Sequence, residues 1–289
     1  MGAGRVGRAL GRGLHTTGWR VGVVVTSSIT SARAAVRAIG AGSPACHATH
    51  HLLDSDVVLI STPDDAVAKL GAELAHIGGA EWGRKVVLHT SGALNGSVLE
   101  PLSKAGAAIG SVHPMQTFIG QNSPPLAGCI FGIEGAPAAA RVATKMCRDL
   151  GGVAVQLRAK GKATYHMAGL FACSHVLALM EAGVQLLMTQ GFTRRRAIRA
   201  LLPLTRQTLD NFDRVGARAA WTGPLVRGDF STVKRHVVAL AKFPREYRDA
   251  YNTLSRLAAL VLSANPDETL NLLNRALGQH GGIKQHGQA

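Results

Sequence analysis

The chain has 289 residues and 46% of them are apolar, so it can form one large domain or two ordinary ones around a sizeable core. Its net charge of +15 favours acidic partners, and an aromatic content of only 4% makes small phosphates or carboxylates better candidates than nucleic acid. We find no secretory signal and no uninterrupted apolar run near the roughly 20 residues of a membrane span, so we expect a cytoplasmic protein. The four cysteines are widely spaced, which favours neither a metal centre nor a disulfide framework.

The first residues, Met-Gly-Ala-Gly-Arg-Val-Gly, have the G-x-G-x-x-G spacing of a dinucleotide-binding turn. In such a turn Gly2 permits the tight bend, Gly4 lets the backbone approach a phosphate, and Gly7 lets helix and strand pack closely. The free N–H groups at the start of the helix, with Arg5 and Val6, would then hold the pyrophosphate. The alternative is an ordinary glycine-rich helix start, but the β-α-β spacing to the next strand favours the dinucleotide site.

A β-strand normally leads into this turn, and in this sequence no residues remain to form it. The first strand of a doubly wound sheet lies at its centre, so its loss would leave open edges and a void in the core. We therefore expect the first strand to be truncated here, and the functional protein to have several more residues.

Short β-rich runs alternate with helical stretches through the first half of the chain. Strands are predicted over 19–27, 55–62, 84–91, 107–114 and 128–135, and helices over 31–39, 64–77 and 137–149. Several runs are continuously apolar, which is typical of parallel strands buried on both faces. The alternation predicts a doubly wound α/β, Rossmann-like domain over residues 1–158.

The pattern becomes helical after about residue 158. A long apolar stretch without proline covers 162–190, and helical periodicity continues over 194–213, 231–241 and 245–263. We predict a mostly α-helical second domain over residues 159–289.

The residues after the first predicted strand bear on the choice of cofactor. Many NAD enzymes have an acidic residue there, whereas this chain has Ser27 and Ser28 followed by Arg33. Hydroxyls and a cation suit a 2′-phosphate, so we expect NADP(H); the alternative that the serines merely cap the next helix is compatible with this role. Thr62 and Pro63 begin a later helix and are expected to line the cofactor crevice.

Two further strings end predicted strands, where ligands bind in an open α/β sheet. Leu-His-Thr-Ser-Gly-Ala-Leu (88–94) places Ser91 at the cofactor, and Ser-Val-His-Pro-Met-Gln-Thr-Phe (111–118) places His113 and Gln116 at the substrate. For His113 a structural hydrogen bond at the strand end is an equal alternative. A third string, Thr-Gly-Pro-Leu-Val-Arg-Gly-Asp (222–229), interrupts the helical half.

At these residues the chain resembles a bacterial family in which a Rossmann-like domain precedes a domain of unknown function, number 2520. The resemblance rests on GAGRVG, HTSGAL, HPMQTF, GKATYHMAGLFACSH and TGPLVRGDFSTVKRH, which together span nearly the whole chain. This family is similar to ketopantoate reductases, pyrroline-5-carboxylate reductases and deazaflavin-dependent NADP reductases, and some members are implicated as alternative ketopantoate reductases. The resemblance implies a nicotinamide-binding fold and a helical domain that often dimerises.

The resemblance also implies roles for residues of the second half. Related reductases begin the first C-terminal helix with Lys-x-x-x-Asn, so Lys162 is the expected acid or electrostatic catalyst and His166 takes the place of the amide. Burial can bring the pKa of a lysine near neutrality, which suits a general acid, whereas the alternative is a surface lysine beside a helix-packing histidine. His175 stands where the family commonly has asparagine, which puts its role at the substrate in question.

Arg227 is a candidate for gripping a substrate carboxylate, because a guanidinium group matches a carboxylate in a forked geometry. Its alternative role is an internal ion pair with Asp229, which we also place at the substrate site.

We therefore expect an NADPH-dependent oxidoreductase that reduces a small oxo acid, with ketopantoate as the leading named substrate. The alternative is a non-catalytic NADP(H)-binding sensor or interaction protein, and nucleic-acid binding by the basic half is the weakest hypothesis. We expect a homodimer, with neither a metal nor a membrane involved.

Overall fold

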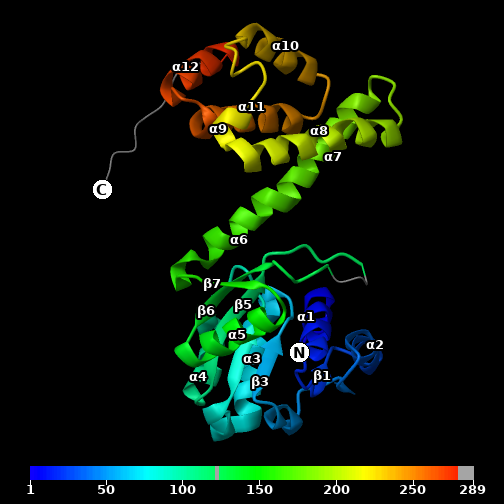
Figure 1. Ribbon diagram of the computed structural model, residues 1–289, viewed down its shortest axis with the longest axis vertical. Coiled ribbons are helices and arrows are strands. Elements are labelled where there is room, and N and C mark those ends of the chain that lie inside the picture. The colour runs from blue at the N-terminus through cyan, green and yellow to red at the C-terminus, as the bar shows by residue number, and fades with distance from the viewer. Residues whose placement is uncertain (121–123, 279–289) are drawn as a thin grey trace. The chain divides into compact units, whose positions relative to one another are not determined.

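The computed structural model describes residues 1–120 and 124–278 and divides into two compact units (Figure 1). The first unit is Met1–His175, and the second begins at Val176. The boundary predicted between residues 158 and 159 follows the last strand. The first unit also contains the helix after that strand, so Lys162 and His166 belong to the same unit as the sheet.

The first unit is a Rossmann-like α/β domain, as the alternation of strands and helices predicted. Five strands are hydrogen-bonded in chain order, namely β3 (Val57–Ile60), β4 (Val86–His89), β5 (Ala108–Pro114), β6 (Ile130–Gly135) and β7 (Val153–Gln156). A separate parallel pair consists of β1 (Val23–Val25) and β2 (Ser43–Ala45).

The β5–β6 pairing is antiparallel, whereas the other pairs are parallel. The expectation of a parallel sheet is therefore wrong for this one pair. No helix joins β5 to β6 in the described part of their connection, and antiparallel strands need no helical crossover.

The first two residues hydrogen-bond to both sheets. The amino group of Met1 donates to Leu59 O at 2.6 Å, and Ser61 N donates to Met1 O at 2.8 Å. On the other side, Gly2 N donates to Val25 O at 2.8 Å. Met1 and Gly2 therefore lie between β1 and β3, where a doubly wound sheet has its central strand. Burial lowers the pKa of the Met1 amino group to about 6.

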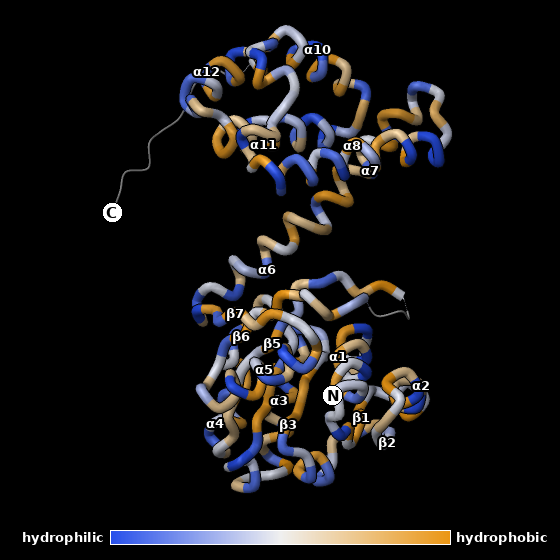
Figure 2. Tube along the Cα trace, viewed as in Figure 1, coloured by the Kyte–Doolittle hydropathy of each residue, from blue (hydrophilic) through white to orange (hydrophobic). Residues whose placement is uncertain are grey.

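Alternate residues of the central strands pack on opposite faces of the sheet. Val86 and Leu88 of β4 pack in one cluster with side chains of α1 (Arg5–Thr16) and α5 (Pro137–Asp149). Val87 packs in a second cluster with α3 (Asp64–Gly78) and α4 (Glu100–Lys104). Burial on both faces is why these strands read as continuous apolar runs in the sequence, and those runs are orange in Figure 2.

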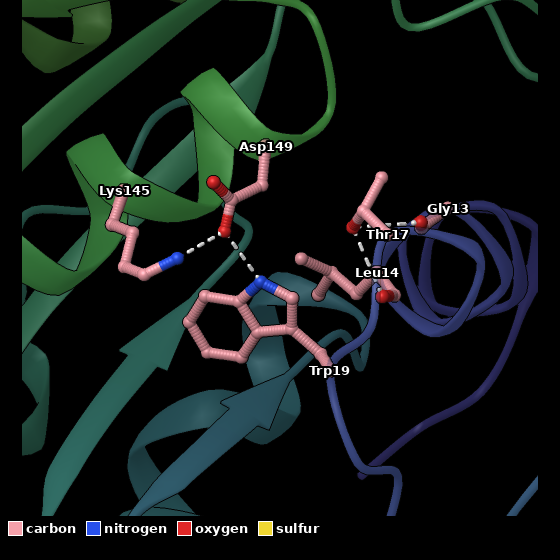
Figure 3. A network of polar contacts seen from close by, with 6 residues as sticks. All are labelled: Gly13, Leu14, Thr17, Trp19, Lys145 and Asp149. Atoms are coloured by element: carbon pink, nitrogen blue, oxygen red, sulfur yellow. Dashed lines mark hydrogen bonds and ion pairs between the residues drawn. The ribbon is translucent and has the colours of Figure 1, made fainter.

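A polar network holds the C-terminal end of α1 against α5 (Figure 3). Asp149 accepts hydrogen bonds from Trp19 Nε1 at 2.7 Å and from Lys145 Nζ at 2.5 Å. Thr17 Oγ1 donates to the carbonyls of Gly13 at 3.2 Å and Leu14 at 3.0 Å, which satisfies acceptors at the end of the helix. The network and the core cluster together fix the direction of α1, and hence the position of its N-terminus.

The other α-helices complete the first unit and form the second. The helices are α2 (Ile29–Ile39), α6 (Lys162–Leu170), α7 (Val176–Met188), α8 (Arg194–Val215), α9 (Ala217–Ala220), α10 (Phe230–Leu240), α11 (Arg245–Leu262) and α12 (Pro266–Ala276). A π-helical turn, Phe171–His175, joins α6 to α7. Three helices and two strands were not indicated by the sequence, namely α4, α9, α12, β2 and β7. The second unit is mostly helical, as expected, and α10, α11 and α12 share an apolar cluster.

By length and composition, the helix that runs over Ala159–Met188 could cross a membrane, although one such helix is weak evidence for a span. Lys162, His166 and His175 interrupt the apolar run of this stretch, which is why the sequence predicted no span there. Only 6% of its apolar window is buried in the structure, so its apolar side chains are largely exposed.

Candidate functional site

The glycine turn lies at the carboxyl ends of β1 and β3. Gly2 has φ +73°, and a Cβ atom there would lie 2.5 Å from Thr62 Cγ2 and 2.7 Å from Thr62 N. A Cβ atom on Gly7 would overlap Ser61 Oγ, so α1 packs directly against the end of β3. In contrast, a Cβ atom on Gly4 would meet only Gly2 O, at 3.8 Å. Gly2 and Gly7 are thus required by the packing of the turn, whereas Gly4 faces open space.

The N-terminus of α1 is suited to an anion. Gly4 is its N-cap residue, no side chain caps the helix, and its first turn contains no acidic residue. The N–H groups of Arg5, Val6 and Gly7 have no intrahelical acceptor, and the helix dipole places partial positive charge there. Beside Gly2, the Oγ1 atom of Thr62 is buried and has no hydrogen-bond partner within the described chain.

The serines after β1 were considered for two roles, capping of the next helix and contact with a 2′-phosphate. Ser28 Oγ accepts a hydrogen bond from Ser31 N at 3.2 Å and thereby caps α2, which is the structural role. Ser27 and Arg33 are exposed and carry no such capping role. No acidic side chain lies between Val25 and Arg33, so the surroundings remain suited to a phosphate.

The turn after β4 is held by a set of short hydrogen bonds. Ser91 Oγ donates to Asp64 Oδ2 at 2.8 Å and accepts from the N–H groups of Ala93 at 3.2 Å and Leu94 at 3.0 Å. Asp64 is in the first turn of α3, directly after Pro63, where a carboxylate is favoured by the helix dipole.

Buried His89 also stabilises the turn after β4. Ser91 N donates to His89 Nδ1 at 3.2 Å, so Nδ1 is the unprotonated nitrogen and Nε2 donates to Asn95 O at 3.1 Å. Burial lowers the pKa of His89 to about 4, which keeps the ring neutral and preserves this arrangement at neutral pH.

Lys162 is buried against this turn. Its side chain is 1% exposed, and Nζ donates to Ser91 O at 2.8 Å. No second protein acceptor within hydrogen-bond distance of Nζ is found among the described residues, although an ammonium group has three N–H donors. Burial lowers the pKa of Lys162 to about 8, while the charges of Glu134 and Asp64 act in the opposite direction. The alternative of a surface lysine is therefore wrong.

Two histidines and a tyrosine lie beside Lys162. The ring of His113 is 5.7 Å from that of His166 and 5.6 Å from that of Tyr165, between ring centroids. Tyr165 OH donates to His113 O at 3.2 Å and lies 3.3 Å from His113 Nδ1, so the side chain of His113 also has the structural hydrogen bond considered for it. Burial lowers the pKa of His113 to about 4, and His166 is exposed.

Gly92 fits between the two histidines. A Cβ atom there would lie 2.5 Å from His166 Cδ2 and 2.8 Å from His113 Nε2. The structure therefore brings Ser91, His113, Lys162 and His166 into one cluster, although they are far apart in the sequence. We call these four residues, with Asp64 and Tyr165, the lysine cluster.

Gln116 and His175 have local contacts of their own. Gln116 is exposed, and its Oε1 atom accepts from Thr117 N at 2.8 Å. His175 is exposed in the π-helical turn, with its ring centroid 4.9 Å from that of Phe171. Their roles at a substrate stay predictions.

Arg227 and Asp229 belong to the second unit. Asp229 caps α10, accepting from Thr232 Oγ1 at 2.6 Å, Ser231 Oγ at 2.8 Å and Thr232 N at 3.1 Å, and these contacts lower its pKa to about 2. Within the described residues no ion pair joins it to Arg227, which is exposed. The internal pair proposed for Arg227 is therefore wrong, and its binding of a carboxylate stays a prediction.

Asp64, His89 and Tyr165 belong to the site but were not predicted from the sequence. Asp64 was visible only as a helix-capping acid in Ser-Thr-Pro-Asp-Asp, and His89 only as part of a buried strand. Tyr165 lies within Lys-Ala-Thr-Tyr-His, where the four-residue spacing indicated only Lys162 and His166 as site residues.

Comparisons with known proteins agree with this architecture. Residues 1–114 match the model of a Rossmann-like domain, and residues 129–258 match the domain of unknown function DUF2520. A search of curated proteins found no match.

Solved structures with a similar fold include several proteins whose descriptions name a nicotinamide cofactor. A candidate NADP oxidoreductase from Bacteroides fragilis has a TM-score of 0.72 at 22% identity, over 89% of this chain and 95% of that one. Protein TM1727 from Thermotoga maritima has a TM-score of 0.64 at 21% identity, over 96% of each chain. A reductive aminase from Aspergillus terreus, in complex with NADPH and ethyl-5-oxohexanoate, has a TM-score of 0.61 at 16% identity, over 96% of this chain and 92% of that one.

At these identities the structural likeness shows the fold alone, whereas the family models match the sequence itself. The chain thus combines a Rossmann-like domain with a DUF2520 domain that follows it.

Proposed function

We propose that this protein is an NADPH-dependent oxidoreductase that reduces the carbonyl group of a small oxo acid. The observation that carries the proposal is Lys162, a buried ammonium group with spare N–H donors in the same unit as the glycine turn. A chain of contacts links the two: Gly2 touches Thr62, Asp64 follows two residues later, and Asp64 bonds to Ser91, the partner of Lys162.

The glycine turn fits the pyrophosphate of a dinucleotide. The α1 N-terminus offers free N–H groups, Gly4 leaves room for a close approach, and Thr62 offers an unpaired buried hydroxyl. The structures with NADPH and with NAD+ bound, from Aspergillus terreus and from Myxococcus stipitatus respectively, have this fold and support the assignment. Such a cofactor supplies hydride to the substrate carbon when it is bound.

Lys162 is the proposed group that stabilises and protonates the developing alkoxide. With a pKa of about 8 it is mostly protonated at pH 7, and its environment makes proton release easier than for an exposed lysine. One N–H group is anchored on Ser91 O, which leaves the others for a substrate oxygen. The exposed ring of His166, one helical turn further on, would orient the substrate.

The substrate is proposed to be a small oxo acid because the spare N–H donors of Lys162 suit a carbonyl oxygen and the net charge of the chain, +15, favours acidic ligands. Ketopantoate is the named candidate, on the family resemblance alone. The second function, a sensor that binds NADP(H) without turnover, is favoured by the departure at His175 from the family pattern.

The experiment that tests the function follows NADPH oxidation at 340 nm with a panel of 2-oxo acids that includes ketopantoate. Saturable turnover with one of them supports the reductase. Tight binding of NADPH by calorimetry without turnover of any substrate would favour the sensor, and no binding of either NADPH or NADH would rule out both.

The preference for a 2′-phosphate predicts a selective effect at Arg33. Replacing Arg33 with alanine should weaken NADPH binding by about tenfold, because one charge-assisted contact to phosphate is lost, and should leave NADH binding unchanged. Arg37, exposed one turn later on α2, gives the matched control. Equal losses for both cofactors, or a loss with Arg37→Ala as large as with Arg33→Ala, would contradict the assignment.

We also propose that the protein is a homodimer. Apolar side chains are exposed along α6 and α7, with Leu177 at 71%, and the series includes Met167, Leu170, Phe171 and Leu179. Such a stripe is typical of a surface that another chain covers. Sedimentation equilibrium should give twice the chain mass for the wild type and the single mass for Leu177→Asp.

A further inference from the structure

A chain of two hydrogen bonds connects a carboxylate on α3 to the buried ammonium group on α6. Asp64 Oδ2 accepts from Ser91 Oγ at 2.8 Å, and Ser91 O accepts from Lys162 Nζ at 2.8 Å. The three residues belong to three separate segments, and Ser91 and Lys162 are 71 positions apart in the sequence. The contact is therefore a product of the tertiary fold.

The direction in which the Ser91 carbonyl points depends on the hydroxyl of the same residue. That hydroxyl donates to Asp64 and accepts from the N–H groups of Ala93 and Leu94, so it organises the whole turn. The Ser91 N–H group is fixed in turn on His89. With its hydroxyl and N–H group both fixed, Ser91 presents its carbonyl oxygen to Lys162.

Charged and titratable groups face Lys162 from several elements. Glu134 of β6 and Asp64 of α3 supply negative charge, and His113 of β5 and His89 of β4 are neutral at pH 7 because burial lowers the pKa of each to about 4. Tyr165, on the same helix, has its ring centroid 5.9 Å from Nζ. Glu134 accepts from Gly96 N at 2.6 Å, so its carboxylate is used in holding a different loop. Asp64 differs from Glu134 because its carboxylate is bonded directly to the residue that anchors Lys162.

We propose that Asp64 is a positioning residue for Lys162, which acts through Ser91 and stabilises the ammonium form of the lysine in the orientation that donates to substrate. The proposal rests on the proposed function for its chemistry. Its geometry stands independently, because the contacts that carry it are made between atoms of the protein itself. Asp64 itself need not touch the substrate or the cofactor.

The test compares Asp64→Asn with Asp65→Asn. Asparagine keeps an oxygen acceptor for Ser91 but removes the charge, so the turn is preserved. Asp65 lies in the same first turn of α3, is exposed, and forms no hydrogen bond or ion pair in the described structure, so it controls for the loss of one charge from the helix N-terminus.

The first readout is the titration of Lys162, followed through the Cε signal of 13C-labelled lysine and assigned with Lys162→Met. Removing the charge of Asp64 removes a stabilisation of the protonated amine, so the pKa of Lys162 should fall further below its wild-type value of about 8. We expect a downward shift of up to about one unit in Asp64→Asn and none in Asp65→Asn. This measurement requires no substrate, so it separates the proposal from the proposed function.

The second readout is the pH profile of turnover. A protonated lysine that acts as the acid loses activity as the pH rises through its pKa, so the basic limb of kcat should move to lower pH in Asp64→Asn. In Asp64→Ala the acceptor is lost as well, so kcat should fall by about tenfold even at the pH where Lys162 is fully protonated, with the basic limb shifted as in Asp64→Asn and the dissociation constant for NADPH unchanged. Ser91→Ala combined with Asp64→Ala should cost little more than either change alone, because both act on the same chain of bonds.

Unchanged titration of Lys162 and an unchanged pH profile in Asp64→Asn would overturn the proposal. Equal shifts in Asp64→Asn and Asp65→Asn would overturn it too, since the effect would then be one of general charge. If no oxo acid is turned over by the wild type, the proposed function fails, while the lysine titration still decides the role of Asp64.

Discussion

Replacement of Lys162 by methionine is expected to lower kcat by about two to three orders of magnitude. The side chain is buried, it has one anchored N–H group, and it is the ammonium group that the structure places in the lysine cluster. Methionine has a similar length and no charge, so the change removes the proton donor and the positive charge while filling most of the same volume. NADPH oxidation under single-turnover conditions measures the effect on the chemical step directly.

The same substitution should leave the free energy of unfolding unchanged or raise it. A buried ammonium group with one acceptor has lost much of its hydration, and replacing such a charge with an apolar side chain is often neutral or stabilising. Activity and stability should therefore move in different directions, which distinguishes a catalytic lysine from a structural one. Lys160→Met, at an exposed lysine two residues earlier, is the matched control for both measurements. Wild-type turnover in Lys162→Met would refute the assignment.

The sheet was predictable because strands such as β3 and β4 pack against apolar clusters on both faces. Val57–Ile60 and Val86–His89 appear in the sequence as unbroken apolar runs, and the structure shows alternate side chains entering two different clusters. The antiparallel direction of β6 was not predictable in this way, since a buried strand has the same apolar run in either direction. The β2 segment, Ser-Pro-Ala, has no continuous apolar run to predict it, and its backbone pairs in parallel with β1.

Several residues of the site could be predicted individually, whereas the hydrogen bonds that connect them could not. The spacing of Lys162 and His166 was readable because one helical turn brings them together, and the glycine spacing identified the turn. The bond from Lys162 to Ser91 depends on how α6 folds back on the sheet, which no local pattern encodes. Asp64 was likewise read only as a residue at the start of a helix, because its partner Ser91 lies 27 residues away at the end of a different strand.

The three glycines of the turn should respond to alanine in two distinct ways. Gly7→Ala places a Cβ atom into Ser61 Oγ and 3.2 Å from Gly2 O, so it should lower the free energy of unfolding by about 1–3 kcal/mol through overpacking. Gly2→Ala adds strain, because φ is +73° and the nearest atoms include the Thr62 backbone. Both changes should weaken cofactor binding through loss of structure, and thermal denaturation would report that loss without any ligand.

Gly4→Ala separates the cofactor role from the structural one. A Cβ atom there meets only Gly2 O at 3.8 Å, so the free energy of unfolding should change by no more than about 1 kcal/mol. If the backbone at Gly4 approaches the pyrophosphate, the added methyl group occupies that space and should weaken NADPH binding by at least about tenfold. Calorimetric titration of NADPH and thermal denaturation of the same sample give both quantities. A stable Gly4→Ala protein that binds NADPH as tightly as the wild type would show that the dinucleotide binds elsewhere, because a pyrophosphate at Gly4 would clash with the added methyl group.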